Sequence, residues 1–235
     1  MKYAVSDIHG CYDKYRDLLN VLALSDDDTL YILGDVIDRG SGGFRILLDM
    51  AERSNVIGLM GNHEAMAIEA LPCLLKAKEQ GERELSIFDM GKIELWFDNG
   101  GRTSLTDYLC LNSNDAEKAV EYMRKLPLYK EVHSGGRDFV LVHGGLEGFS
   151  PSKPLASYKR DEIVWCRPEK NTEYFPDKYT VFGHTPTQLI DQRSENIYTP
   201  KICYGNKWAD IDCGCGYKNG RLGCLCLDSM EEIYV

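Results

Sequence analysis

Three short apolar runs, at residues 3–6, 29–33 and 55–60, alternate with two segments in which apolar residues recur at helical spacing. The first of these segments begins at Tyr12, and the second covers residues 44–52. Strands that alternate with helices predict an α/β fold with right-handed crossover connections and a largely parallel sheet. Sheets of this kind bind ligands beyond the carboxyl ends of their strands. The alternation therefore predicts the core of the fold and the edge at which a functional site would lie.

Five short blocks combine glycine with Asp, Asn or His, and the first three directly follow the predicted strands. The blocks are SDIHG (6–10), GDVIDRG (34–40), GNHE (61–64), HGG (143–145) and GHTP (183–186). Carboxylate, amide and imidazole groups bind hard or borderline divalent cations, and glycine lets the backbone approach them closely. Any one block is a weak signal, because an isolated Asp-x-His is most often a turn. Their joint occurrence predicts a two-metal site that cleaves phosphate esters.

The candidate metal ligands are Asp7, His9, Asp35, Asn62, His143 and His184. Asp7 and His9 are two residues apart at a strand end, so their side chains can point the same way. Asp35 has two carboxylate oxygens with which to bridge two cations. Two cations about 3.5–4 Å apart can clamp a phosphate and lower the pKa of a shared water, which generates hydroxide near neutral pH. We expect manganese, with iron or zinc as alternatives.

Further residues are candidates for proton transfer and phosphate binding. His63 is placed to donate a proton to the leaving group, and Asp38 could orient its imidazole and favour the charged form. Arg39 and Arg167 could bind phosphate oxygens through two N–H groups each and stabilise charge in the transition state. Glu64 is expected to stabilise the start of a helix through the helix dipole and not to bind metal.

The rest of the chain predicts further helices and strands. A helix is expected over residues 64–78, with Pro72 as a possible kink or break, and an amphipathic helix over residues 115–126. Residues 80–112 are expected to form helices and a loop beside the site. Residues 134–136, Ser-Gly-Gly, predict the turn of a hairpin. The runs with strand character are residues 128–133, 138–143, 163–165, 179–182, 208–212, 222–228 and 232–235.

Charge and length limit the class of protein. With 235 residues, the chain can bury one substantial core, so one domain over residues 1–235 is expected. A net charge of −10 argues against nucleic acid or an anionic membrane surface as the main partner. No apolar segment is long enough for a transmembrane helix, and the first block begins too early to leave room for a signal peptide. We therefore expect a cytoplasmic protein.

The nine cysteines are expected to be reduced, and most of them to be small buried apolar residues. Four of them form two C-x-C pairs, Cys213 with Cys215 and Cys224 with Cys226. A zinc site of four thiolates usually has pairs spaced C-x2-C or wider. A β-hairpin explains the pairs better, because residues two apart share one face of a strand.

Together the blocks resemble the phosphoprotein phosphatase group of calcineurin-like metallophosphoesterases, and within it the compact bacterial and phage serine/threonine phosphatases. The family's D-x-H-G, G-D-x-x-D-R-G, G-N-H-E, H-G/A-G and G-H-T stand at residues 7–10, 34–40, 61–64, 143–145 and 183–185. Residues 211–215 resemble its I-D-x-G-C strand, and residues 99–101 resemble an Asn-Gly-Gly element. The S-A-P-N-Y-C element of the eukaryotic members has no counterpart, and residues 147–157 are specific to this chain.

The resemblance implies a sandwich of two mixed β-sheets flanked by helices, with a βαβαβ core and the metals above the sheet edges. It assigns Asp7, His9 and Asp35 to the first metal and Asp35, Asn62, His143 and His184 to the second. It also assigns proton donation to His63 with Asp38, and phosphate binding to Arg39 and Arg167.

The resemblance implies hydrolysis of phosphoserine and phosphothreonine in proteins or peptides, and of phosphotyrosine as a further candidate. A metal-bridging hydroxide would attack phosphorus in line, without a phosphoenzyme. Symmetrical cleavage of diadenosine tetraphosphate is the nearest alternative, because relatives with these motifs hydrolyse dinucleoside polyphosphates. A non-catalytic phosphate-binding protein is disfavoured, because His63, Asp38 and Arg39 are all retained.

Overall fold

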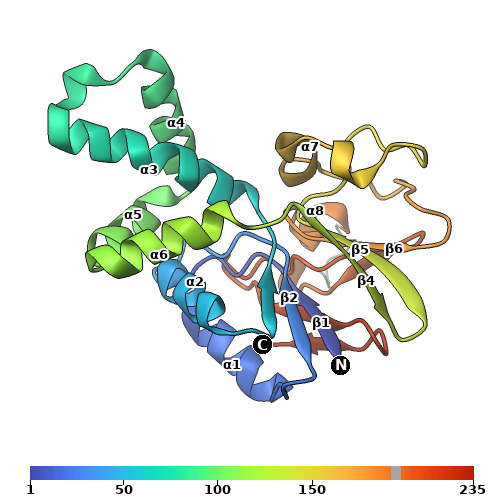
Figure 1. The fold of residues 1–235 in the computed structure, drawn as a ribbon. Coiled ribbons are helices and arrows are strands. Elements are labelled where there is room, and N and C mark those ends of the chain that lie inside the picture. The colour runs from blue at the N-terminus through green and yellow to red at the C-terminus, as the bar shows by residue number, and fades with distance from the viewer. Residues whose placement is uncertain (192–196) are drawn as a thin grey trace.

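The computed structural model describes residues 1–191 and 197–235. Two five-stranded sheets pack against each other and are flanked by helices and long loops, as Figure 1 shows. The α/β sandwich that the resemblance implies is confirmed, and so is its βαβαβ start.

Both ends of the described chain contribute to the first sheet. Its strands are β1 (Lys2–Val5), β2 (Thr29–Ile32), β3 (Val56–Gly58), β9 (Gly223–Cys226) and β10 (Glu232–Tyr234), in the order β10-β9-β1-β2-β3. β1, β2 and β3 are parallel and are connected through α1 (Tyr12–Leu22) and α2 (Gly43–Glu52). β9 runs antiparallel to both β1 and β10.

The second sheet contains the predicted hairpin. Its strands are β4 (Tyr129–Ser134), β5 (Arg137–Val142), β6 (Tyr179–Phe182), β7 (Cys203–Gly205) and β8 (Trp208–Asp210), in the order β4-β5-β6-β8-β7. β5, β6 and β8 are parallel, and β4 and β7 are antiparallel edge strands. Gly135 and Gly136 between β4 and β5 have φ of 55° and 73°. Two positive φ values suit the tight turn that follows the twist of a hairpin.

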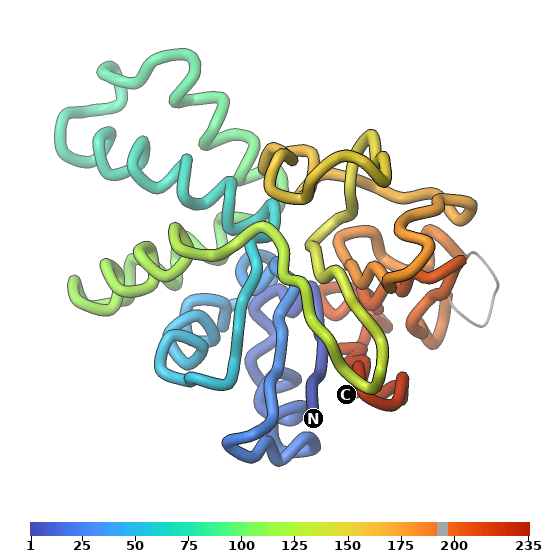
Figure 2. The backbone as a smooth tube through the Cα atoms, turned by 45° about the vertical axis from the view of Figure 1, so that its right-hand side comes forward, coloured from blue at the N-terminus to red at the C-terminus, as the bar shows by residue number. Residues whose placement is uncertain are grey.

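Most of the remaining helices follow β3. They are α3 (Asn62–Gln80), η1 (Glu82–Glu84), α4 (Ile87–Asp98), α5 (Gly101–Leu109), α6 (Ser113–Arg124), η2 (Leu155–Ser157), α7 (Arg160–Val164) and α8 (Thr187–Ile190). α3 and α4 form a hairpin that projects from the sandwich, which Figure 2 shows from a second side. None of the helices in the described ranges has the length and apolar character needed to cross a membrane.

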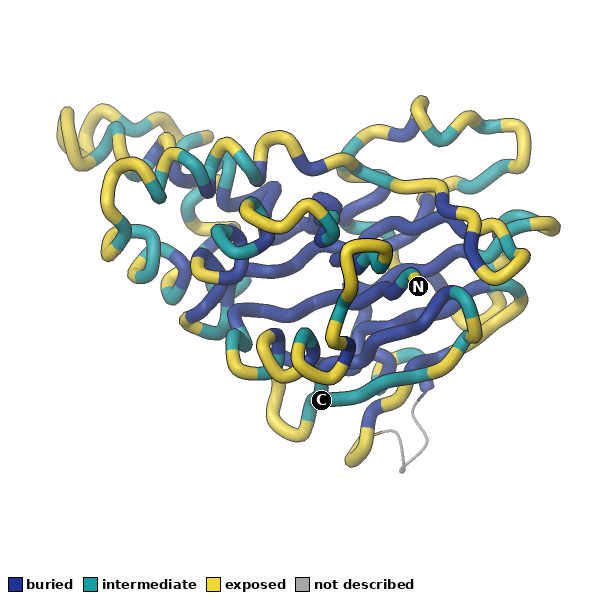
Figure 3. Tube along the Cα trace, turned by 60° about the horizontal axis from the view of Figure 1, so that its bottom comes forward, coloured by how far each residue is buried: buried dark blue, intermediate teal, exposed yellow. Residues whose placement is uncertain are grey.

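Three apolar clusters hold the layers together. Alternate residues of β1 point to opposite faces, so Val5 packs towards the helices and Ala4 packs between the sheets. A third cluster, around Phe182 and Trp208, lies between the second sheet and the loops that follow β5. Figure 3 shows the strands as a buried band beneath exposed helix surfaces. This core fixes the strand ends from which the candidate site residues extend.

The structure differs from the predicted elements at three places. α3 continues through Pro72, whose side chain is exposed, so the helix is not broken there. Residues 163–165, which have strand character, lie at the end of α7 and just beyond it. An apolar run this short fits either a strand or one buried helical turn, and Ile163 and Val164 are buried as part of a turn.

The predicted cysteine hairpin is also wrong. β8 belongs to the second sheet and β9 to the first, so residues 211–222 cross from one sheet to the other. Cys224 and Cys226 lie in β9, whereas Cys213 and Cys215 lie in the crossing segment. All four are buried free thiols. No cysteine is part of a possible metal-binding group in the described ranges, so zinc binding by these thiols is not supported.

Candidate metal centre

The candidate ligands gather at the carboxyl ends of the parallel strands, as predicted. Asp7 follows β1, Asp35 follows β2, and Asn62 is the first residue of α3 after β3. His143 follows β5 and His184 follows β6, so the second sheet adds its ligands at the same edge. All five of these side chains and that of His9 are buried. The sandwich therefore brings together six buried side chains with nitrogen or oxygen donors from distant parts of the sequence.

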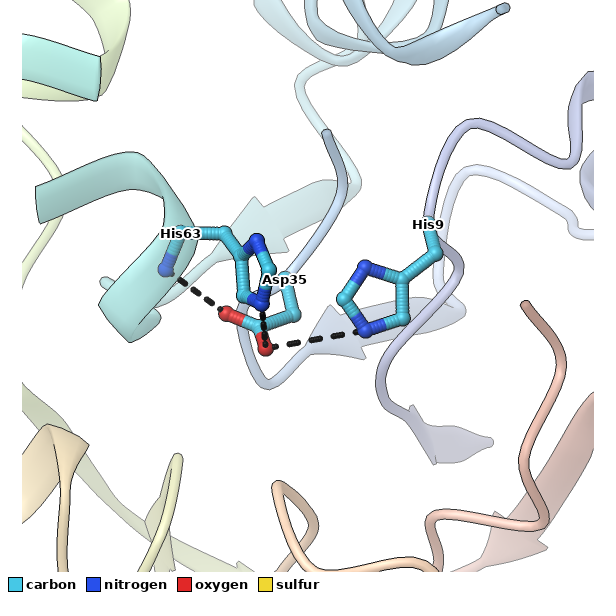
Figure 4. Close-up of side chains that lie close together, drawn as sticks. All are labelled: His9, Asp35 and His63. Carbon is cyan, nitrogen blue, oxygen red and sulfur yellow. Dashed lines mark hydrogen bonds and ion pairs between the residues drawn. The ribbon is translucent and has the colours of Figure 1, made fainter. Parts of the chain in front are cut away.

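Two possible metal-binding groups share Asp35. The first contains His9, Asp35 and His63, which Figure 4 shows, and the second contains Asp35, His143 and His184. Asp35 Oδ2 lies 3.7 Å from Nε2 of both His9 and His63. Its other oxygen, Oδ1, lies 3.3 Å from His143 Nε2. Each carboxylate oxygen therefore faces one group, which is the arrangement that a bridging ligand requires.

The two remaining candidates lie beside these groups. Asp7 Oδ1 is 3.8 Å from His9 Nε2, and Asp7 Oδ2 accepts a hydrogen bond of 2.9 Å from the backbone N–H of His184. Asn62 Oδ1 is 2.9 Å from His143 Nε2. All six ligand candidates are thus brought together, and His63 joins them from the set predicted for catalysis.

Two imidazole rings, those of His9 and His143, have Nδ1 held by a backbone carbonyl and Nε2 directed towards Asp35. His9 Nδ1 donates to the carbonyl of Ile37 over 3.0 Å, and His143 Nδ1 donates to the carbonyl of Leu33 over 2.7 Å. A carbonyl only accepts, so both rings carry a proton on Nδ1, and His9 presents the lone pair of its Nε2. His143 differs, because its Nε2 donates to Asn62 Oδ1. Burial alone would lower the pKa of His143, but the Asp35 carboxylate raises it to about 9, so a cation bound there would displace the Nε2 proton. In the described part of the chain, His9 Nε2 and His184 Nε2 are buried without a hydrogen-bond partner. Buried polar atoms are normally paired, so this donor set fits divalent cations.

Burial and mutual charge set the protonation of these groups. Burial lowers the pKa of His184 to about 2 and holds that of His9 well below its usual value. Both rings are therefore neutral, as metal binding requires. Burial and the charge of Asp35 raise the pKa of Asp7 to about 6. Although burial alone would raise it, His143 and His63 keep the pKa of Asp35 well below its usual range.

His63 has an environment unlike that of the other rings. Its Nδ1 lies 2.6 Å from Asp38 Oδ2, and its Nε2 lies 3.5 Å from Nη2 of Arg39. Burial alone would lower its pKa, but the carboxylates of Asp35 and Asp38 raise it. The two carboxylates therefore favour the protonated form of His63, which is the form that a proton donor needs.

Residues 3–211 match the family model described as calcineurin-like phosphoesterase. The chain belongs to this family. Membership in a metallophosphoesterase family implies divalent metal ions, and the shared Asp35 with its flanking histidines supplies donors for them. The resemblance to the phosphoprotein phosphatase group is confirmed at the family level.

Relatives of this calcineurin-like phosphoesterase have different named activities. A symmetrical bis(5'-nucleosyl)-tetraphosphatase of Acidovorax ebreus (strain TPSY) is 32% identical over 146 residues, which are 61% of this chain and 43% of that protein. The chain thus spans less than half the length of that relative. Serine/threonine-protein phosphatase 2 of Salmonella typhimurium is 26% identical over 224 residues, which are 87% of this chain and 89% of that protein.

A solved structure with a provisional description as a diadenosine tetraphosphatase has the same fold. It superposes with a TM-score of 0.63 at 20% identity and covers 100% of this chain and 92% of its own. At this identity the likeness shows the fold alone.

Glu64 has a larger role than the helix-dipole effect expected from the sequence. Its buried carboxylate accepts hydrogen bonds from the backbone N–H groups of Asp35 (2.8 Å), Val36 (2.8 Å), Ile37 (3.3 Å) and Gly61 (3.0 Å). Glu64 therefore ties the loop that carries Asp35 to the start of α3. A Glu in the first turn of a helix is the sequence signal for such a cap, but the contact with the distant loop has no local signal.

The sequence does not indicate the residues that hold Asp38. Trp96 Nε1 donates to Asp38 Oδ1 and Oδ2 over 3.1 Å and 2.9 Å, and the Ser104 hydroxyl accepts from the backbone N–H of Asp38 over 2.7 Å. Both residues are fully buried. Gly100 of the Asn-Gly-Gly element accepts from the backbone N–H of Arg39 over 3.3 Å. Residues 80–112 therefore flank the site, as expected.

The two arginines lie beside the two groups of donors. The half-buried Arg39 packs its guanidinium over the Tyr217 ring, 4.6 Å from the ring centroid. Arg167 is exposed, and its Nη1 donates to the His184 carbonyl (3.3 Å) and to Thr185 Oγ1 (3.2 Å). An anion bound at the candidate metal ligands would therefore have the Arg39 guanidinium near His63 and the Arg167 guanidinium near His184.

The site has an unusual backbone. Ten non-glycine residues in the described ranges have positive φ, and six of these are site candidates. They are Asp7 (55°), His9 (48°), Asp35 (54°), Asp38 (71°), Arg39 (67°) and His184 (68°). Each such residue costs roughly 1–3 kcal/mol and persists only where the surroundings enforce it. Strain concentrated in this way is typical of functional sites.

Proposed function

We propose that this chain hydrolyses phosphoserine and phosphothreonine in proteins, and phosphotyrosine as a further substrate, with two divalent cations. The observation that carries the proposal is the convergence of two groups of buried donors on the two oxygens of Asp35. In this proposal Asp7, His9 and Asp35 hold one cation, and Asp35, Asn62, His143 and His184 hold the other. Manganese is the proposed metal, because the donors are oxygen and imidazole nitrogen and not thiolate.

A bound pair of cations supplies Lewis-acid charge neutralisation and an activated water for direct attack on phosphorus. The protein supplies the orientation of the donors. Hydrogen bonds from His9 Nδ1 and His143 Nδ1 to backbone carbonyls fix both rings, and Glu64 fixes the loop of Asp35. Such outer contacts keep ligands in place without reorganisation during the reaction.

We assign proton donation to His63. With Nδ1 held by Asp38, the proton on Nε2 is directed towards the donors, where the leaving alkoxide would lie. Trp96 in turn holds the Asp38 carboxylate with its indole N–H. The raised pKa of His63 supports this role, because an acid must be protonated when the leaving group departs.

We assign binding of the phosphoryl oxygens to Arg39 and Arg167. The chain has a net charge of −10, so local cations must offset the long-range repulsion of an anionic substrate. Planar guanidinium groups can each bind two phosphate oxygens and stabilise charge that develops during transfer.

Charge around the site supports a phosphoprotein as substrate. A phosphorylated side chain carries about −1.5 to −2 charges at neutral pH, which two arginines and two cations can offset. Beyond the candidate phosphate contact at Arg167, the wall of the adjoining cavity carries the carboxylates of Glu147 and Glu169. These would repel the additional phosphates of a polyphosphate. Alignment over 87% of this chain with a serine/threonine-protein phosphatase gives further support.

Symmetrical hydrolysis of dinucleoside tetraphosphates is a second candidate. It is favoured by the 32% identity to the Acidovorax tetraphosphatase, which is higher than the 26% identity to the Salmonella phosphatase. The test is a comparison of kcat/KM for a phosphoserine peptide, a phosphothreonine peptide and diadenosine tetraphosphate with added manganese. Turnover of both peptides well above that of the dinucleotide is expected. Turnover of the dinucleotide alone would replace the first proposal by the second.

A further inference from the structure

A cavity of about 340 Å³ adjoins Arg167, the candidate contact for the substrate phosphate. Its lining includes Leu146 and Phe149 from the loop after β5, and Trp165, Arg167 and Tyr174 from the segment after α7. Two of these lining residues, Trp165 and Arg167, contact the candidate metal ligand His184. The Trp165 ring stands nearly perpendicular to the His184 ring at 5.9 Å, and Arg167 contacts the His184 carbonyl. A substrate group in this cavity would therefore lie next to the reacting phosphate.

The wall of the cavity is aromatic and well supported. Phe149 packs edge-on against Tyr174 at 5.3 Å and against Phe175 at 4.8 Å. The Tyr174 hydroxyl accepts a hydrogen bond of 3.3 Å from the backbone N–H of Leu146. These contacts tie the two loops together, so the wall is formed before any ligand binds. Preorganised aromatic surface binds ligands at a low entropic cost.

The charged side chains that line the cavity are two carboxylates and the Arg167 guanidinium, so its net charge is negative. Glu147 and Glu169 line it and are exposed. Neither has an ion-pair partner within residues 1–191 and 197–235, whereas Glu162 close by is paired with Lys153. The backbone of Glu169 is fixed by hydrogen bonds with Thr172 in both directions. Carboxylates beside aromatic faces are the groups that bind guanidinium and ammonium ions.

We propose that this cavity binds an arginine or lysine side chain of the substrate, one or two residues from the phosphorylated residue. An extended chain advances about 3.3–3.6 Å per residue, so a long basic side chain beside the phosphoresidue can reach the cavity from the phosphate contact at Arg167. This inference rests on the proposed protein phosphatase activity and adds a sequence preference to it. The same carboxylates disfavour the phosphates of a nucleotide, which is the competing occupant.

The test uses phosphoserine peptides in which Arg, Ala or Glu occupies each position within two residues of the phosphoserine. At one position or more, kcat/KM should be roughly tenfold higher with Arg than with Ala, and lower still with Glu. That ratio is the amount expected from a partly exposed charge pair combined with an aromatic contact. The double variant Glu147→Gln/Glu169→Gln should bring the ratio of Arg to Ala peptides close to one.

The ratio is measured within one enzyme preparation, so a loss of folded protein cancels. Glu94→Gln/Glu117→Gln is the matched control, because it removes two exposed carboxylates from α4 and α6 and should keep the wild-type ratio. Equal turnover of Arg and Ala peptides, or a ratio that persists in the Glu147/Glu169 variant, overturns the inference and leaves the proposed phosphatase activity intact. Turnover of diadenosine tetraphosphate without turnover of any peptide overturns both.

Discussion

Replacing Glu64 by Gln tests whether this carboxylate holds the metal centre in shape. Oε2 accepts from Asp35 N and Gly61 N, and Oε1 accepts from Val36 N and Ile37 N. A Gln side chain keeps one acceptor oxygen and turns an NH2 group towards the other two N–H donors. Two buried donors lose their partner at about 1–3 kcal/mol each, so the free energy of unfolding should fall by about 2–6 kcal/mol.

The same change should displace the loop of Asp35, so metal affinity should fall roughly 10- to 100-fold. Urea unfolding of the metal-free protein and calorimetric titration with Mn²⁺ measure the two effects separately. Glu69→Gln is the matched control, because Glu69 lies on the same helix and its carboxylate pairs with the half-exposed Arg160. An unfolding midpoint and an Mn²⁺ affinity equal to those of the wild type would refute the role given to Glu64.

Three further substitutions test the catalytic assignments. His63→Asn should lower kcat roughly 10²- to 10⁴-fold while elemental analysis still finds two metal ions, and undiminished turnover would remove His63 from the mechanism. Asp38→Asn should lower the pKa of His63, because the Asp38 carboxylate raises it. Since the acid must be protonated, the falling alkaline limb of the kcat profile should move to lower pH, and an unmoved limb contradicts the pairing. Asp35→Asn should lose both metals in elemental analysis, and retention of two would exclude a shared ligand.

The sequence predicted the part of the fold that local periodicity encodes. The alternating β1 to β3 region and the Gly135-Gly136 hairpin were both predicted, because each follows from residues close together in the chain. Sheet membership of the late strands could not be predicted in this way. β9 pairs with β1 from the other end of the chain, and no local pattern distinguishes that partner from β8. The cysteine hairpin failed for this reason.

The same distinction applies to the site. The candidate ligands carry a chemical signal at strand ends, so their convergence could be expected from the blocks. Trp96 and Ser104 carry no such signal, because an indole and a hydroxyl in a helix are ordinary core residues until Asp38 is placed against them. The positive φ of 54° at Asp35 also could not be predicted, because the residue type Asp does not by itself indicate a left-handed backbone conformation.

The left-handed backbone at the candidate ligands places stability and activity in opposition. Glycine adopts such conformations freely, so a Gly at the position of His9 or Asp35 would relieve local strain while removing a metal donor. The metal donors at these positions are therefore held in a backbone conformation that costs local stability, which the surrounding contacts must offset.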